Sequence, residues 1–170
     1  MYLITGVMAA GKSTTAEALA LKLDKCVHLR GDVFRRMISS GREEMSAAPS
    51  EEAVRQLHLR YRLTAEAAKT YFDGGFSVVV QDNYYGEALP RMLRLLQGYP
   101  VEAVVLPSLA AVKEREEKRA KTGYTGFSPE ALYDAFLAET PRVGFWLDNT
   151  SLSPAQAADA ILRRCAGVNG

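Results

Sequence analysis

Residues 6–14 read GVMAAGKST, and this stretch decides the fold. It matches the pattern G-x-x-x-x-G-K-[ST], in which glycines let successive backbone amides turn inward around phosphate oxygens. The apolar run Tyr2–Thr5 comes directly before it, and a helical stretch begins at Lys12. A glycine turn that only caps a helix is the alternative. The strand before the loop and the helix after it favour a phosphate-binding loop, because they are the context that the motif requires.

The positions of this loop have predicted roles in binding a nucleoside triphosphate. Lys12 should reach the β and γ phosphates, and the Ser13 hydroxyl should bind Mg²⁺. The helix that begins here adds the positive end of its dipole to the anion site. The predicted cofactor-binding residues of the loop are Gly6, Ala9, Ala10, Gly11, Lys12, Ser13 and Thr14.

The composition is that of an ordinary globular protein. The chain has 170 residues, of which 48% are hydrophobic and 24% charged, so we expect one domain over residues 1–170. With 21 basic and 20 acidic residues, the overall charge favours neither nucleic acid nor an anionic membrane. Cys26 and Cys165 lack metal-ligand spacing, and neither a secretory signal nor a membrane span is evident. We therefore expect a cytoplasmic protein; the sequence predicts no particular oligomeric state.

Short apolar runs alternate with longer stretches of helical spacing. The predicted strands are 2–5, 26–29, 76–81, 101–106 and 144–147. The predicted helices are 12–23, 33–39, 51–72, 87–96, 109–121, 129–139 and 154–165. This alternation predicts a three-layer α/β/α domain with a mainly parallel sheet of about five strands, and ligands at the carboxyl ends of the strands.

Asp32 and Arg35 follow the second predicted strand, in the sequence GDVFR of residues 31–35. Asp32 is placed to accept the proton of an acceptor hydroxyl, and Arg35 to hold an anionic group or developing charge. The alternative is that Asp32 only caps the helix that begins there. Helix 51–72 carries Arg55, Arg60 and Arg62. One or more of these could contact an anionic acceptor, but a solvated helix face is the better interpretation.

Asp82 ends the third predicted strand, where P-loop enzymes carry a carboxylate that helps to hold Mg²⁺. A turn-forming role is the alternative. Tyr84 follows, and we expect it to line the mouth of the site and contact the acceptor, although core packing explains a tyrosine equally well.

With these residues, the chain resembles the P-loop kinases of small molecules, the group that contains gluconate kinase, adenylyl-sulphate kinase and chloramphenicol phosphotransferase. Residues 31–35 are most similar to the G-D-x-x-R pattern of adenylyl-sulphate kinase, whereas polynucleotide 5′-kinases carry serine where Gly31 stands. The resemblance implies ATP and Mg²⁺ as cofactors and a small-molecule hydroxyl as acceptor. The acceptor class stays open, because gluconate kinase prefers histidine at the position of Arg35.

The resemblance also assigns a lid and an adenine loop. Residues 113–128 correspond to the small helical lid, in which Arg115 would pack on adenine and Arg119 would touch the transferring phosphoryl group. Asn149 lies in the loop that borders adenine. Read locally, that loop is a turn in which Ser153 caps the last helix and Pro154 takes its first position.

The predicted function is transfer of the γ-phosphoryl group of ATP to a hydroxyl, with Lys12, Asp32 and Arg119 as catalytic residues. A polynucleotide or nucleoside 5′-hydroxyl kinase is one alternative, although arginines interleaved with acids argue against nucleic acid as a partner. A non-catalytic ATP-binding protein or slow NTPase is the other. The chain lacks the N-K-x-D and D-x-x-G elements that a GTPase switch would need.

Overall fold

A single parallel sheet forms the centre of the fold. The computed structural model describes residues 1–7, 9–46, 48–107 and 129–166. Within them, five strands pair in the order β2-β3-β1-β4-β5, and every pair is parallel. The mainly parallel sheet and all five predicted strands are confirmed. The strands are β1 (Tyr2–Gly6), β2 (Cys26–Arg30), β3 (Ser77–Gln81), β4 (Glu102–Leu106) and β5 (Phe145–Trp146).

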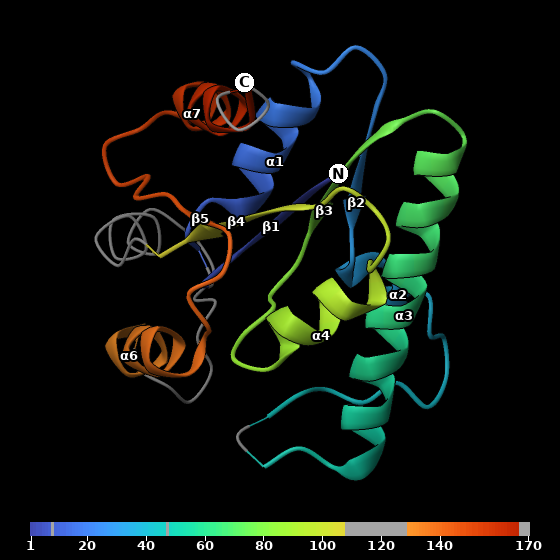
Figure 1. The fold of residues 1–170 in the computed structure, drawn as a ribbon. Helices are drawn as coiled ribbons and strands as arrows, with labels where there is room; N and C mark the ends of the chain where they lie inside the picture. The colour runs from blue at the N-terminus through green and yellow to red at the C-terminus, as the bar shows by residue number, and fades with distance from the viewer. Residues whose placement is uncertain (8, 47, 108–128, 167–170) are drawn as a thin grey trace.

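Helices cover the sheet on both sides, which confirms the three-layer α/β/α architecture. Helices α1 and α7 pack together on one side, and α3 lies against β2 and β3 beside α4 on the other (Figure 1). The predicted helix 109–121 and the loop 122–128 lie outside the described residues. The described helices are α1 (Lys12–Ala20), α2 (Asp32–Arg36), α3 (Glu51–Asp73), α4 (Ala88–Leu95), α6 (Pro129–Glu139) and α7 (Pro154–Ala166).

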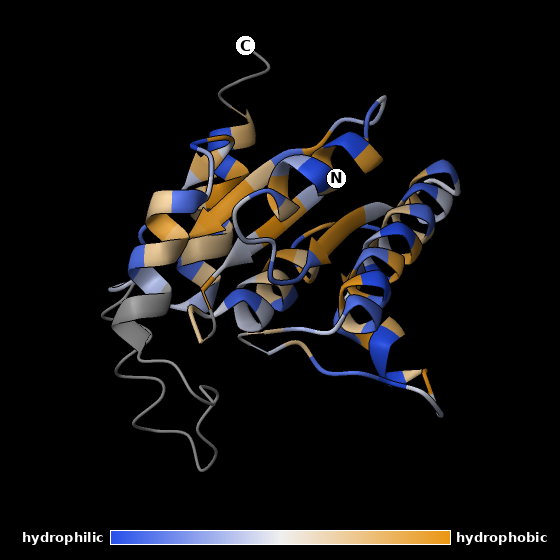
Figure 2. Cartoon of the chain, turned by 90° about the horizontal axis from the view of Figure 1, so that it is seen from below, coloured by the Kyte–Doolittle hydropathy of each residue, from blue (hydrophilic) through white to orange (hydrophobic). Residues whose placement is uncertain are grey.

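The three central strands, β3, β1 and β4, are apolar and buried on both faces. Leu3 and Ile4 of β1 and residues 78–80 of β3 are fully inaccessible to solvent. Such near-continuous runs of β-branched and aliphatic residues are typical of a parallel sheet between two helical layers. Figure 2 shows the strands in hydrophobic colours, whereas α3 carries hydrophobic and hydrophilic positions in alternation along its length.

Side-chain caps fix the starts of two helices. Ser50 accepts a hydrogen bond from the Ala53 amide at the start of α3, with an N–O distance of 3.0 Å. At the start of α7, Ser153 accepts from the Gln156 amide, and the Gln156 side chain accepts from the Ser153 amide. This reciprocal capping confirms the local interpretation of that turn. None of the described helices combines the length and apolar character needed to cross a membrane.

Candidate active site

The phosphate loop leaves β1 through backbone conformations that favour glycine. Gly6 has a φ of 145°, and a Cβ added there would lie 2.3 Å from the Leu106 carbonyl oxygen. Gly11, directly before α1, has a left-handed φ of 87°. A side chain at either position would therefore be strained or would collide with backbone. The two motif glycines are needed for the turn that carries the loop from strand to helix.

Lys12 and Ser13 lie at the start of α1, close to the carboxyl ends of β1 and β3. The Lys12 Nζ atom donates to the carbonyl oxygens of Gly6 at 2.9 Å and Val7 at 2.6 Å, so the ammonium group lies over the loop. The Lys12 side chain is buried, with 7% of the residue's surface exposed. The Ser13 hydroxyl donates to the Gln81 side-chain oxygen at 3.2 Å. The structure thus brings the two central residues of the motif to one edge of the sheet.

Asn149, in the loop after β5, forms a hydrogen bond with the phosphate loop. Its side-chain nitrogen donates to the Ala10 carbonyl at 2.8 Å, and the residue is 1% exposed. Its Oδ1 atom is buried and has no hydrogen-bond partner among the described residues. The side chain therefore fixes the phosphate loop, and its contact with adenine stays a prediction.

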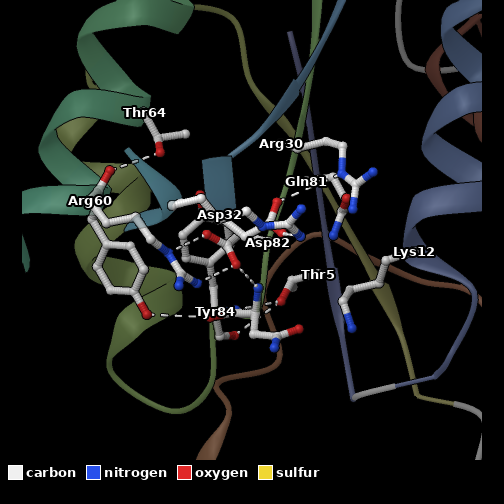
Figure 3. Close-up of polar contacts among 12 residues, drawn as sticks. Thr5, Lys12, Arg30, Asp32, Arg60, Thr64, Gln81, Asp82 and Tyr84 are labelled. Carbon is white, nitrogen blue, oxygen red and sulfur yellow. Dashed lines mark hydrogen bonds and ion pairs between the residues drawn. The ribbon is translucent and has the colours of Figure 1, made fainter. Parts of the chain in front are cut away.

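A buried ion pair joins β3 to α3. Arg60 donates from Nε to one carboxylate oxygen of Asp82 at 2.8 Å and from Nη2 to the other at 2.5 Å. The Asn83 amide donates to the second oxygen at 2.7 Å. Burial raises the pKa of Asp82 above its usual range, and the Arg60 guanidinium opposes that shift. The pair occupies the left and centre of the close-up (Figure 3).

The solvated role predicted for Arg60 is wrong. Its side chain is only 12% exposed, because it reaches from α3 to the buried carboxylate at the end of β3. Arg55, by contrast, is 67% exposed, and its ion-pair partners in the described part of the chain are Glu51 and Glu52 of its own helix. No local signal distinguishes the two arginines, since the partner of Arg60 stands 22 residues away in the chain.

Gly31 gives this ion pair the room that it occupies. A Cβ at Gly31 would lie 2.2 Å from Asp82 Oδ2 and 3.1 Å from the Thr64 hydroxyl. The serine that polynucleotide 5′-kinases carry here would collide with Asp82 in this arrangement. The glycine in residues 31–35 is thus a steric requirement of the buried carboxylate.

Asp32 and Asp82 lie near each other at the ends of β2 and β3, close enough for the charge of Asp32 to add to the raised pKa of Asp82. Asp32 is 31% exposed at the side chain and forms ion pairs with Arg36 and, at 3.7 Å, with Arg30. It makes no capping hydrogen bond at the start of α2. Gly31 takes the N-cap position of α2, and Asp32 is the acidic residue of its first turn. Figure 3 shows the Asp32 side chain in the group around Asp82, and its catalytic role stays a prediction.

Arg35 projects toward the loop that follows α2. It forms an ion pair with Glu44, and this pairing lowers the pKa of the Glu44 carboxyl. Its side chain is 29% exposed. The structure therefore places Arg35 one turn beyond Asp32, as predicted, but already beside a carboxylate of the protein.

The predicted acceptor contact of Tyr84 is corrected by its burial. The residue is fully inaccessible, and its ring packs against Tyr61 with 5.1 Å between the ring centroids. Thr5 holds the backbone here, because its hydroxyl accepts from the Tyr84 amide at 2.9 Å and donates to the Tyr84 carbonyl at 3.2 Å. Tyr84 is a core residue, which was the alternative interpretation.

The oxygen atoms near the loop fit one kind of Mg²⁺ site. Mg²⁺ in nucleotide sites is usually held by few protein oxygens together with phosphates and water. The Ser13 hydroxyl and the Gln81 side-chain oxygen lie together at the carboxyl end of β3. Both oxygens of Asp82, however, are engaged by Arg60 and the Asn83 amide. No cluster of three or more metal-ligating side chains occurs in the described part of the chain.

The predicted lid, residues 113–128 with Arg115 and Arg119, lies outside the described part of the chain.

Comparison with known proteins identifies the family. Residues 1–142 match the model of the AAA_33 family, an AAA domain, and this span includes the phosphate loop, Asp32 and Asp82. The chain belongs to the AAA_33 family. Among curated proteins, no relative matches it.

Solved structures share the fold of this AAA_33 chain over nearly its whole length. The Mycobacterium tuberculosis APS kinase CysC, in complex with AMPPNP and APS, has a TM-score of 0.72 and 16% identity, covering 97% of this chain and 96% of that one. The Deinococcus radiodurans tunicamycin resistance protein has a TM-score of 0.71 and 18% identity, covering 96% and 94%. A sugar kinase from Janibacter sp. HTCC2649 has a TM-score of 0.66 and 20% identity, covering 97% and 93%. The fold that the resemblance to small-molecule P-loop kinases implies is thus confirmed.

Proposed function

We propose that the chain is an ATP-dependent phosphotransferase of the cytoplasm that moves the γ-phosphoryl group to a hydroxyl of a small molecule. The observation that carries this proposal is the meeting of three groups at one sheet edge. These are the phosphate loop with Lys12, the Ser13 hydroxyl, and the partly exposed carboxylate of Asp32. The partly exposed carboxylate at the end of β2 supports an acceptor, because such a group can orient a hydroxyl for transfer.

In this reaction the acceptor oxygen forms a bond to the γ phosphorus while the bond from that phosphorus to the β–γ bridging oxygen breaks. The products are a phosphate monoester and ADP, and the proton of the hydroxyl is released. Asp32 orients the hydroxyl by accepting its hydrogen bond and takes up the proton as the bond forms. Arg36 and Arg30 hold the Asp32 carboxylate in place.

Lys12 stabilises the charge that develops on the transferring group. The two carbonyl contacts of its ammonium keep the side chain over the loop, where phosphate oxygens approach. Asn149 keeps the loop itself in position through the Ala10 carbonyl. Arg115 and Arg119 are proposed to close over the nucleotide and the phosphoryl group, as the resemblance implies.

Ser13 is the residue that we propose to hold Mg²⁺, which would neutralise phosphate charge when bound. Gln81 keeps the serine hydroxyl at the edge of the sheet. Direct metal binding by Asp82 would require Arg60 to release the carboxylate, so we propose that Asp82 mainly positions Arg60.

The test is ADP formation from Mg·ATP across a panel of acceptors: sugars, sugar acids, nucleosides, 5′-hydroxyl oligonucleotides and apolar alcohols. One class should raise ADP well above the rate without acceptor, and Asp32→Asn should abolish that rise while ATP binding persists. The matched control is Asp24→Asn, which alters an exposed aspartate in the turn after α1. Stimulation by oligonucleotides alone, weakening steeply with salt, would favour the polynucleotide alternative. ATP binding without stimulation by any class would favour a non-catalytic protein.

A further inference from the structure

Most of the exposed apolar side chains gather on one side of the fold. Helix α3 is the longest of the described helices and lies at the outer edge of the domain, with α2 packed beside it (Figure 1). Eight large apolar side chains are exposed in the described part of the chain, and six of them belong to α2, to α3 or to the segment between these helices. Gathered apolar side chains are typical of an interaction site, whereas scattered ones need no explanation. The six are Val33, Met37, Met45, Leu59, Leu63 and Tyr71.

The space beneath this surface is too small for a ligand that would cover it. Between α2 and α3 the cavity volume is about 40 Å³, which holds about three water molecules. Leu59 and Leu63 line this space from α3, and they are nevertheless 40% and 41% exposed. Both leucines therefore face the solvent, one helical turn apart, where a partner could remove their apolar surface from water.

Charged residues of both signs flank the two leucines. Arg62 is exposed and forms no ion pair with another described residue. Glu66 follows one turn later on the same face and is 69% exposed at the side chain. One of its carboxylate oxygens accepts from Lys69 at 3.0 Å, whereas the other has no hydrogen bond within the described residues. An unpaired cation and a half-engaged anion thus lie four positions apart on the outer face of α3.

We propose that a second copy of this chain docks on this face, through an antiparallel contact between the two α3 helices. A two-fold axis level with position 64 places residues equally far before and after that position opposite each other. Arg62 then faces Glu66 of the partner subunit, and the symmetry repeats this ion pair on the other side of the axis. Leu63 lies next to the axis and meets Leu63 of the partner subunit. The charges of α3 thus match a copy of α3 itself, and this match identifies the occupant.

The same register pairs unlike charges at the ends of the contact. Arg55 and Asp73 are both exposed and lie nine positions before and nine positions after position 64. Arg55 therefore faces Asp73 of the partner subunit. The ion pairs that Arg55 forms within its own helix are exposed, so they compete only weakly. Leu59 lies beside the partner's Lys69, whose aliphatic stem adds apolar contact.

The experiment is sedimentation equilibrium of the full chain over a concentration series up to about 100 μM. The wild type should pass from monomer to dimer within this range. Arg62→Glu and Glu66→Arg should each weaken the association by about tenfold or more, because like charges then face each other twice. Leu63→Gln should weaken it about three- to tenfold, because an amide replaces apolar contact at the axis.

The decisive measurement mixes the two charge variants, each labelled with a different fluorophore. Arg62→Glu chains present two carboxylates where Glu66→Arg chains present two arginines, so the mixture should form heterodimers although each variant alone stays monomeric. An unfolded variant could not give this rescue, which separates loss of the contact from loss of the fold. The matched controls are Arg94→Glu on α4 and Leu21→Gln at the end of α1, both at exposed residues outside the proposed contact, and both should dimerise like the wild type.

Three results would overturn the proposal. The first is a wild type that remains monomeric throughout the series. The second is a dimer that Arg62→Glu, Glu66→Arg and Leu63→Gln leave intact, because another surface must then hold it. The third is a mixture of the two charge variants without heterodimers, because the antiparallel register requires their rescue. The contact uses no residue of the phosphate loop, so none of these results bears on phosphoryl transfer.

Discussion

The buried pair of Arg60 and Asp82 offers the sharpest test of the site's architecture. Replacing Arg60 by methionine keeps most of the apolar stem but leaves the Asp82 carboxylate buried at 4% exposure without its cation. Breaking such a pair typically costs 3–5 kcal/mol. Asp82 keeps one hydrogen bond from the Asn83 amide, so we expect a loss at the lower end, about 3 kcal/mol. This is a large part of the 5–15 kcal/mol typical of a folded domain.

The assay is urea unfolding of wild type, Arg60→Met, Asp82→Asn and the double variant. The double variant should recover about 2 kcal/mol relative to the sum of the single losses, because removing both partners leaves no unpaired charge. Arg55→Met, at an exposed arginine of the same helix, is the control and should leave the unfolding midpoint nearly unchanged. Additive losses, or a loss below about 1 kcal/mol for Arg60→Met, would show that Arg60 does not stabilise the buried Asp82 carboxylate.

The stability of Arg60→Met relative to wild type should depend on pH. Burial raises the pKa of Asp82, and Arg60 is the group that opposes this shift. In Arg60→Met the pKa should therefore rise further above that of the unfolded chain. A carboxyl with a raised pKa in the folded state destabilises the fold when ionised, and the penalty disappears as it is protonated. The stability gap to wild type should thus narrow as the pH falls from about 8 toward 5, and a gap that widens would contradict the account.

Three further predictions concern residues around this pair. Gly31→Ser should destabilise the protein by about 1–3 kcal/mol in thermal unfolding, because the added Cβ meets Asp82 at 2.2 Å; an unchanged melting temperature would show that Asp82 moves without cost. Asn149→Ala should weaken binding of Mg·ATP in calorimetry, because the hydrogen bond to the Ala10 carbonyl is lost; unaltered binding would mean that the loop needs no support. Burial raises the pKa of Tyr61 to about 12, so stability should be lost as the pH rises from about 10 toward 12 and the loss should be smaller in Tyr61→Phe; equal alkaline losses would contradict this.

The fold was largely predictable because its signals are local. Each strand is a short apolar run, and the three central strands, β3, β1 and β4, are buried along nearly their whole length. The phosphate loop is equally local, since Gly6, Gly11 and Lys12 belong to one contiguous motif. The start of α7 was predictable for the same reason, with Ser153 and Pro154 adjacent.

The inner part of the site was not predictable because it depends on pairs far apart in the sequence. Arg60 looks like any other basic residue of an amphipathic helix until the fold brings Asp82 to it. Tyr84 follows a strand end, as a residue of the site mouth would, but the chain turns its ring inward against Tyr61. The sequence held one signal for this arrangement, which is the polar Thr5 in an otherwise apolar strand. The Thr5 hydroxyl forms hydrogen bonds with the backbone amide and carbonyl of Tyr84.

The ion pair of Arg35 was also not predictable from the sequence. Arg35 follows Asp32 by three positions and was expected to hold an anion. The structure pairs it with Glu44, nine positions further along the chain, and engages Gln56 with the loop between them. Only the arrangement of loop and helix reveals that this arginine forms an ion pair with Glu44.

The most direct test of the central claim is the product of the reaction with γ-labelled ATP and the acceptor that stimulates ADP release. If the chain is a phosphotransferase, the label appears on the acceptor hydroxyl in a one-to-one ratio with ADP. Asp32→Asn and Lys12→Ala should then lose this product, whereas Asp24→Asn should keep it. Label released only as inorganic phosphate, or transfer that survives in Asp32→Asn at the wild-type rate, would contradict this proposal.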